Sequence, residues 1–107
     1  MLTEEERRVF GALWAVARRL ARGRGLAAYF ELSDLERKFW EAADSCEPDA
    51  PARLLGLARE VASRARELGC VEWARASLVI EAAAAYLQAK AEAGEGRDPL
   101  DLLRQYV

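Results

Sequence analysis

The chain has 107 residues and a mass of 11.9 kDa, which fits one folded domain, expected to span residues 1–107. Hydrophobic residues make up 52% and charged residues 32%, a composition that excludes a disordered tail. The net charge of −2 argues against a polybasic protein, and the absence of histidine excludes Ser-His-Asp or Cys-His catalysis and histidine-ligated zinc.

The commonest residues are strong helix formers, which predicts a fold made of helices. Ala, Leu, Arg and Glu dominate the sequence, whereas β-branched residues are few. We therefore expect an all-α protein, a compact bundle of four main helices with a short C-terminal helix. The most apolar run, residues 74–91, contains several charged residues and is too polar to span a bilayer. Without a secretory signal pattern, the protein is expected to be cytoplasmic and to have no membrane partner.

The first two predicted helices begin at residues that commonly cap helix N-termini. Thr3 caps the first, with Glu6 completing a capping box, and this helix is expected to end near Arg22, before a Gly-Arg-Gly turn. Ser33 is the predicted cap of the second, which should end near Cys46. The preceding residues, 26–32, are expected to form one or two helical turns.

Glycine residues mark the predicted ends of the remaining helices. The third should begin at Ala50 or Pro51 and end at Gly69, and the fourth should cover residues 71–93. A last short helix is expected to open at Pro99. The fourth helix is apolar on most of its circumference, which is typical of a helix at the centre of a bundle or at a subunit interface.

Arginines gather on one side of the first helix and in the turn after it. Arginine far outnumbers lysine, which indicates either GC-rich coding, as in thermophiles, or recognition of phosphate or carboxylate groups. Four arginines have no acidic residue nearby in sequence, and Tyr29 follows them with a ring that can stack on a base. These residues form the candidate site for single-stranded nucleic acid: Arg18, Arg19, Arg22, Arg24 and Tyr29. We call the four arginines the arginine ridge.

A second candidate surface combines acidic, aromatic and small residues. Residues 31–50 are strongly acidic, and this charge is either neutralised by the first helix or available to a partner. Trp40 does not lie on the apolar side of its predicted helix, so it is either an interface residue or covered by another segment. The candidate interface residues are Glu36, Trp40, Glu41, Asp44, Ala84, Leu103 and Tyr106.

No residue pattern indicates catalysis, a metal site or a cofactor. Cys46 and Cys70 flank the third helix, whose ends should lie roughly 27 Å apart, so no disulfide is expected between them. The predicted function is a small non-catalytic interaction subunit that self-associates or docks into a larger complex. The alternative is a helical nucleic-acid-binding subunit of a ribonucleoprotein or DNA-processing assembly that uses the arginine ridge.

Overall fold

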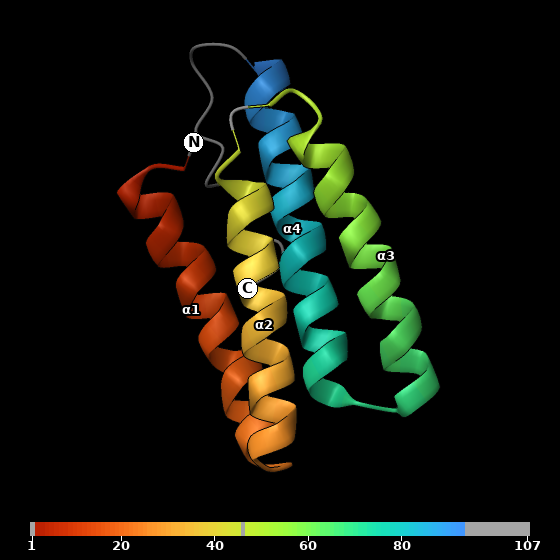
Figure 1. Ribbon diagram of the computed structural model, residues 1–107. Coiled ribbons are helices and arrows are strands. Elements are labelled where there is room, and N and C mark those ends of the chain that lie inside the picture. The colour runs from red at the N-terminus through yellow and green to blue at the C-terminus, as the bar shows by residue number, and fades with distance from the viewer. Residues whose placement is uncertain (1, 46, 94–107) are drawn as a thin grey trace.

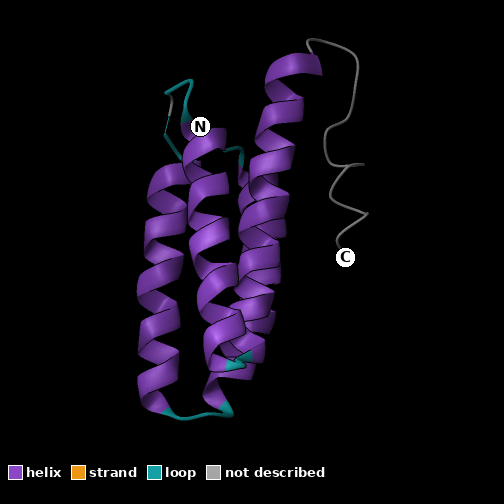
Figure 2. Cartoon of the chain, turned by 90° about the vertical axis from the view of Figure 1, so that its right-hand side faces the viewer, coloured by secondary structure: helices purple, strands orange, loops and turns teal. Residues whose placement is uncertain are grey.

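The computed structural model describes residues 2–45 and 47–93, which form four helices in an up-down-up-down bundle (Figure 1). The helices are α1 (Glu4–Arg22), α2 (Leu26–Ala43), α3 (Ala50–Leu68) and α4 (Val71–Ala93). The α1–α2 turn and the α3–α4 turn lie at the same end of the bundle (Figures 1 and 2). The predicted all-α bundle of four main helices is confirmed, and the short C-terminal helix lies outside the described residues.

Local sequence signals account for most of the helix ends. The Thr3 hydroxyl accepts a hydrogen bond from the Glu6 amide, and the Glu6 carboxylate accepts one from the Thr3 amide, as predicted for a capping box. Gly69 ends α3 in the left-handed conformation with φ of 63°, which glycine adopts without steric cost. The observed bounds of α1, α3 and α4 match the predicted ones.

The predicted start of the second helix at Ser33 is wrong, because α2 begins seven residues earlier, at Leu26. Gly25 has a φ of 117°, so it reverses the chain and lets the new helix begin directly after it. Ser33 is therefore an interior residue, and its hydroxyl donates to the Tyr29 carbonyl one turn earlier, at 2.9 Å. Glu36 does not close a capping box but faces α1.

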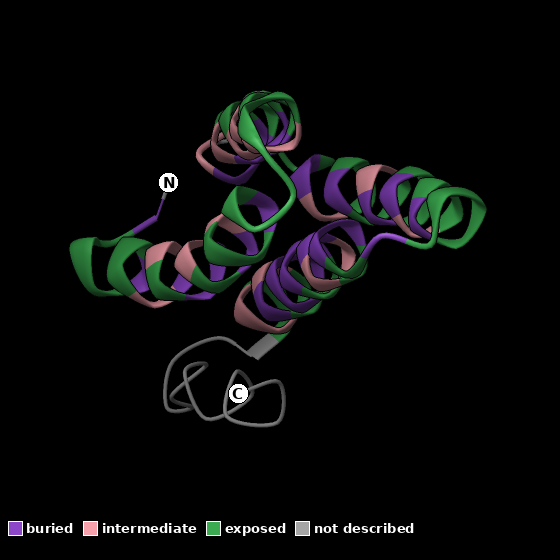
Figure 3. Cartoon of the chain, turned by 90° about the horizontal axis from the view of Figure 1, so that it is seen from below, coloured by how far each residue is buried: buried purple, intermediate pink, exposed green. Residues whose placement is uncertain are grey.

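The four helices share one hydrophobic core, and α4 lies at its centre as predicted. α4 contacts all three other helices and packs most extensively against α3. Buried positions face one another across the bundle when it is viewed from below (Figure 3). The Phe39 ring lies 5.9 Å from that of Phe10 and 5.3 Å from that of Trp14, centre to centre, which joins α1 to α2.

Two further observations concern membrane-spanning helices and the cysteines. No helix within the described residues is long and apolar enough to cross a membrane. Cys70 is a buried thiol, while Cys46 lies outside the described residues, so the expected absence of a disulfide stays a prediction.

Candidate interaction surface

Two arginines of the arginine ridge are engaged by acidic residues of the same chain. The Arg18 guanidinium forms an ion pair with Glu36 of α2. The Arg24 guanidinium donates to the buried Glu72 carboxylate and to the Cys70 sulfur, where α4 begins. Because a phosphate would have to replace these acidic partners, Arg18 and Arg24 do not form a free cationic patch.

The other two ridge arginines are exposed. Arg22 places its guanidinium 5.1 Å from the centre of the Tyr29 ring, which is cation–π geometry. Arg19 and Arg22 form no ion pair with residues 2–45 and 47–93. Together with Tyr29, these two arginines are the part of the predicted nucleic-acid site that remains available.

Five predicted site residues meet in one surface hollow of about 500 Å³ between α1 and α2. The sequence assigned them to two different sites, but the fold brings both sets together. The hollow is lined by Arg18, Tyr29, Ser33, Glu36, Arg37, Trp40 and Glu41. Its charges are paired internally, because Glu36 binds Arg18 and Glu41 accepts from Arg37 at 2.9 Å.

Trp40 lies at the edge of this hollow and is partly covered by its own chain. Its indole nitrogen donates to Glu36 at 2.9 Å, and its ring meets the Phe39 ring edge-on at 5.0 Å between centres. The indole N–H therefore already has a partner, and much of the ring packs against the core. Its role in an interface stays a prediction.

The acidic stretch of α2 is largely neutralised within the molecule. Asp44 forms an ion pair with Arg7 and accepts a hydrogen bond from the Leu2 amide at 3.2 Å. That amide and the Arg7 guanidinium hold the pKa of Asp44 below its ordinary value, although burial opposes the shift. Of the two explanations for the segregated charge, the structure shows intramolecular pairing along the α1–α2 contact.

One predicted interface residue is placed incorrectly by the sequence analysis. Ala84 is only 5% exposed because it faces the core, whereas the neighbouring Ala85 is exposed. Since α4 is apolar nearly all round, periodicity alone does not separate its core side from its outer side. Leu103 and Tyr106 lie outside the described residues.

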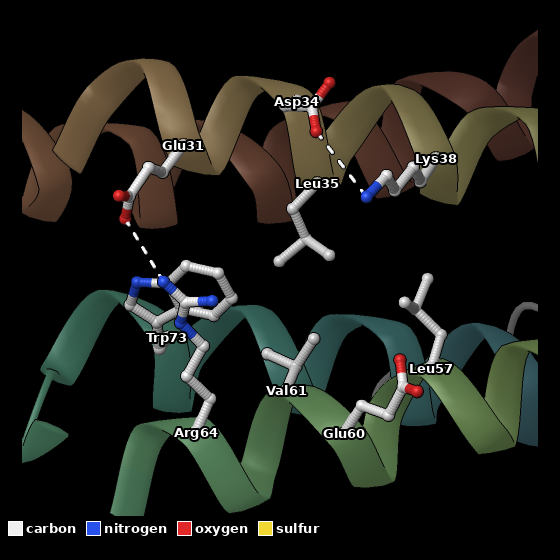
Figure 4. Close-up of a pocket in the computed structure, with 9 residues that line it drawn as sticks. All are labelled: Glu31, Asp34, Leu35, Lys38, Leu57, Glu60, Val61, Arg64 and Trp73. Atoms are coloured by element: carbon white, nitrogen blue, oxygen red, sulfur yellow. Dashed lines mark ion pairs between the residues drawn. The ribbon is translucent and has the colours of Figure 1, made fainter. Parts of the chain in front are cut away.

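A cleft of about 420 Å³ between α2 and α3 was not predicted (Figure 4). Leu35, Val61 and Trp73 give it apolar surfaces, and charged side chains stand at its edges. Arg64 lies over the Trp73 ring, 4.6 Å from its centre, and reaches Glu31 across the cleft at 3.8 Å. This cross-cleft ion pair links the two helices, and no buried unpartnered polar atom points to a ligand between them.

A second feature missed by the sequence analysis is an exposed apolar surface on α4 and the adjoining side of α1. Val71 and Leu78 are 64% and 49% exposed, and Ala74 is exposed between them. Leu13 of α1 lines a small hollow with Leu78, and Val16 and Leu20 continue that side of α1 at helical spacing. We call this set the outer α4 surface: Val16, Leu20, Val71, Ala74 and Leu78.

Two further observations belong to the outer α4 surface. An apolar groove of about 450 Å³ borders it, formed where Ala62 and Ala65 of α3 meet Ala74 and Leu78. Arg75 lies beside Leu78 and is partly buried, with a side-chain Nε that has no hydrogen-bond partner. A buried donor without an acceptor is energetically unfavourable, and residues 2–45 and 47–93 provide no acceptor for this one.

Comparison with protein-family models, with curated proteins and with solved structures finds no match for this chain. Within residues 2–45 and 47–93, no three side chains of the types that ligate metals lie close enough together to hold an ion. The functional proposal therefore rests on the surfaces described above.

Proposed function

We propose that the protein is a small non-catalytic interaction subunit that binds its partner through the outer α4 surface. The observation that carries this proposal is the exposure of branched apolar side chains on α4 and on the adjoining side of α1. Burying apolar area contributes about 25 cal/mol per Å², so a partner that covers Val71, Leu78 and Leu20 gains favourable free energy.

A competing apolar patch is smaller and comes from one helix. Leu26 and Phe30 are exposed on the first turns of α2, where the Phe30 ring lies 5.9 Å from the Tyr29 ring. Neither of the two buried side-chain atoms that lack a partner among residues 2–45 and 47–93 belongs to this patch. This patch provides a matched control for the outer α4 surface.

Nucleic-acid binding is the second candidate, and it has less support. It depends on Arg19, Arg22 and Tyr29, because Arg18 and Arg24 already bind carboxylates of the same chain. Two exposed arginines provide few phosphate contacts, whereas phosphate contacts supply most of the affinity in sequence-independent binding.

The native size of the protein in extracts of its own cells tests the proposal. We expect the chain to elute well above its own mass of 11.9 kDa and the Leu78→Glu variant to elute as a monomer. Phe30→Glu introduces the same charge on the other apolar patch and should leave the complex intact. Monomeric elution of the unmodified chain, or loss of the complex only with Phe30→Glu, would contradict the assignment.

A further inference from the structure

We propose that the partner of the outer α4 surface is a second copy of this chain, bound with the two α4 helices antiparallel and Leu78 at the two-fold axis. This inference rests on the proposed function, because it identifies the partner of the same surface. It is drawn from the arrangement of apolar and charged residues about Leu78.

Two exposed apolar residues of α4 are spaced symmetrically about Leu78. Val71 lies seven residues before it and Ala85 seven residues after it, and both are exposed. Seven residues correspond to nearly two full helical turns, or roughly 10.5 Å, so all three lie along one side of the helix. In an antiparallel pair centred on Leu78, each Val71 is level with Ala85 of the partner subunit. A branched side chain thus meets a small one, which allows the helices to approach closely.

The charged residues show the same symmetry. Arg75 lies three residues before Leu78 and Glu81 three residues after it. Three residues rise about 4.5 Å along a helix, so the antiparallel arrangement places each Arg75 level with Glu81 of the partner subunit. Both pairs form at once, because a two-fold interface repeats every contact.

Within residues 2–45 and 47–93, Arg75 and Glu81 have no ion-pair partner. Arg75 also has a buried Nε without an acceptor, and Glu81 is an exposed acceptor on the same helix. The intermolecular pair would therefore supply an acceptor that the described residues of one chain do not provide. Such mutual complementarity of charge is required of an isologous interface and is not required for an unrelated partner.

Charge reversal in the purified full-length chain tests the antiparallel pairing. We expect the unmodified chain to form a dimer, and Arg75→Glu or Glu81→Arg to raise its dissociation constant about tenfold or more, because each places two pairs of like charges together. Combining both substitutions should restore the dissociation constant to within about threefold of the original, since the pairs re-form with exchanged signs. Sedimentation velocity over a concentration series measures these constants.

Two comparisons keep the experiment decisive. Arg37→Glu makes the same charge change on α2 and should leave the dimer unchanged, and circular dichroism should show the same helix content in every variant. A dimer that the double substitution does not restore would contradict the antiparallel pairing.

The purified chain and the cell extract together separate the two proposals. If the purified chain is monomeric while the complex in extracts still depends on Leu78, the second copy is wrong and the proposed function stands. In that case the surface binds another protein. If both preparations are monomeric, both proposals fail.

Discussion

The two halves of the contact between α1 and α4 differ in whether a buried polar group has hydrogen-bond partners. Where α1 begins, the Glu6 carboxylate is buried and accepts hydrogen bonds from Tyr86 and from Lys90, the latter at 2.9 and 3.1 Å. The Phe10 ring meets the Tyr86 ring edge-on at 5.7 Å between centres. This half is closed, because its buried carboxylate has partners from both helices.

The half where α1 ends remains open. Leu78, Val16 and Leu20 keep more than a third of their surface exposed, and Arg75 retains a buried Nε without an acceptor. The Glu6 carboxylate thus finds its partners within the described residues, whereas the Arg75 Nε does not. The difference teaches that a partnered carboxylate accompanies a closed contact, whereas an unpartnered donor beside exposed apolar side chains marks a surface where an acceptor from another chain can bind.

The largest expected effect on the free energy of unfolding comes from truncating a buried aromatic side chain in the closed half. Phe10→Ala should lower the free energy of unfolding by about 3–5 kcal/mol, because it leaves a cavity among the rings of Phe39 and Tyr86. Leu20→Ala in the open half should cost less than about 1 kcal/mol, because solvent already reaches that side chain. Urea unfolding followed by circular dichroism measures both values, and equal losses would remove the distinction between the halves.

The second prediction concerns the buried carboxylate. Burial by itself would raise the pKa of Glu6, but hydrogen bonds from the Thr3 amide, Tyr86 and Lys90, with the Lys90 charge, lower this pKa from 4.5 to about 2. The resulting stabilisation is fully present above pH 4.5 and is lost as the pH falls towards 2. Glu6→Gln should therefore cost about 2–3 kcal/mol at pH 7.

Unfolding at several pH values checks this prediction. The difference between the Glu6→Gln variant and the unmodified chain should shrink steadily between pH 4.5 and 2, because in this range the Glu6 carboxylate binds a proton in the unfolded chain but stays ionised in the native chain. Glu5→Gln is a suitable control, since Glu5 is an exposed acid on the same turn. A difference that does not change with pH would show that Glu6 contributes by packing alone.

The smallest effect is expected at the unpaired arginine. Arg75→Met removes the donor without an acceptor and keeps the length of an apolar side chain, so the free energy of unfolding should change by less than about 0.5 kcal/mol or increase. The comparison should be made in the Leu78→Glu background, so that association does not add to the measured stability. A loss above about 2 kcal/mol would show that Arg75 has a stabilising partner within its own chain.

Helix identity and most helix ends could be predicted because their causes are local. The Thr3 and Glu6 capping box, Pro51 in the first turn of α3 and the left-handed Gly69 each act within a few residues. The same local reasoning failed at Ser33, because a residue that caps a helix also fits inside one when an earlier glycine begins it.

The candidate sites were only partly predictable from the sequence. Their residue types were recognised, but the partners of Arg18 and Arg24 lie 18 and 48 residues away and came from other helices. Likewise, the apolar circumference of α4 indicated a core or an interface without showing which positions serve which role. Packing placed Ala84 inside and left Val71 and Leu78 outside.

The sequence by itself determined that the described part of this protein is helical, where three of the four described helices begin and end, and that the charge of the chain is nearly balanced. Capping, glycine conformation and helix propensity are properties of neighbouring residues, so they are readable along the chain. Only the tertiary structure decided which charges neutralise one another and which apolar residues stay exposed. Those outcomes depend on distances between helices, because burial and ion pairing are set by whatever packs against each side chain.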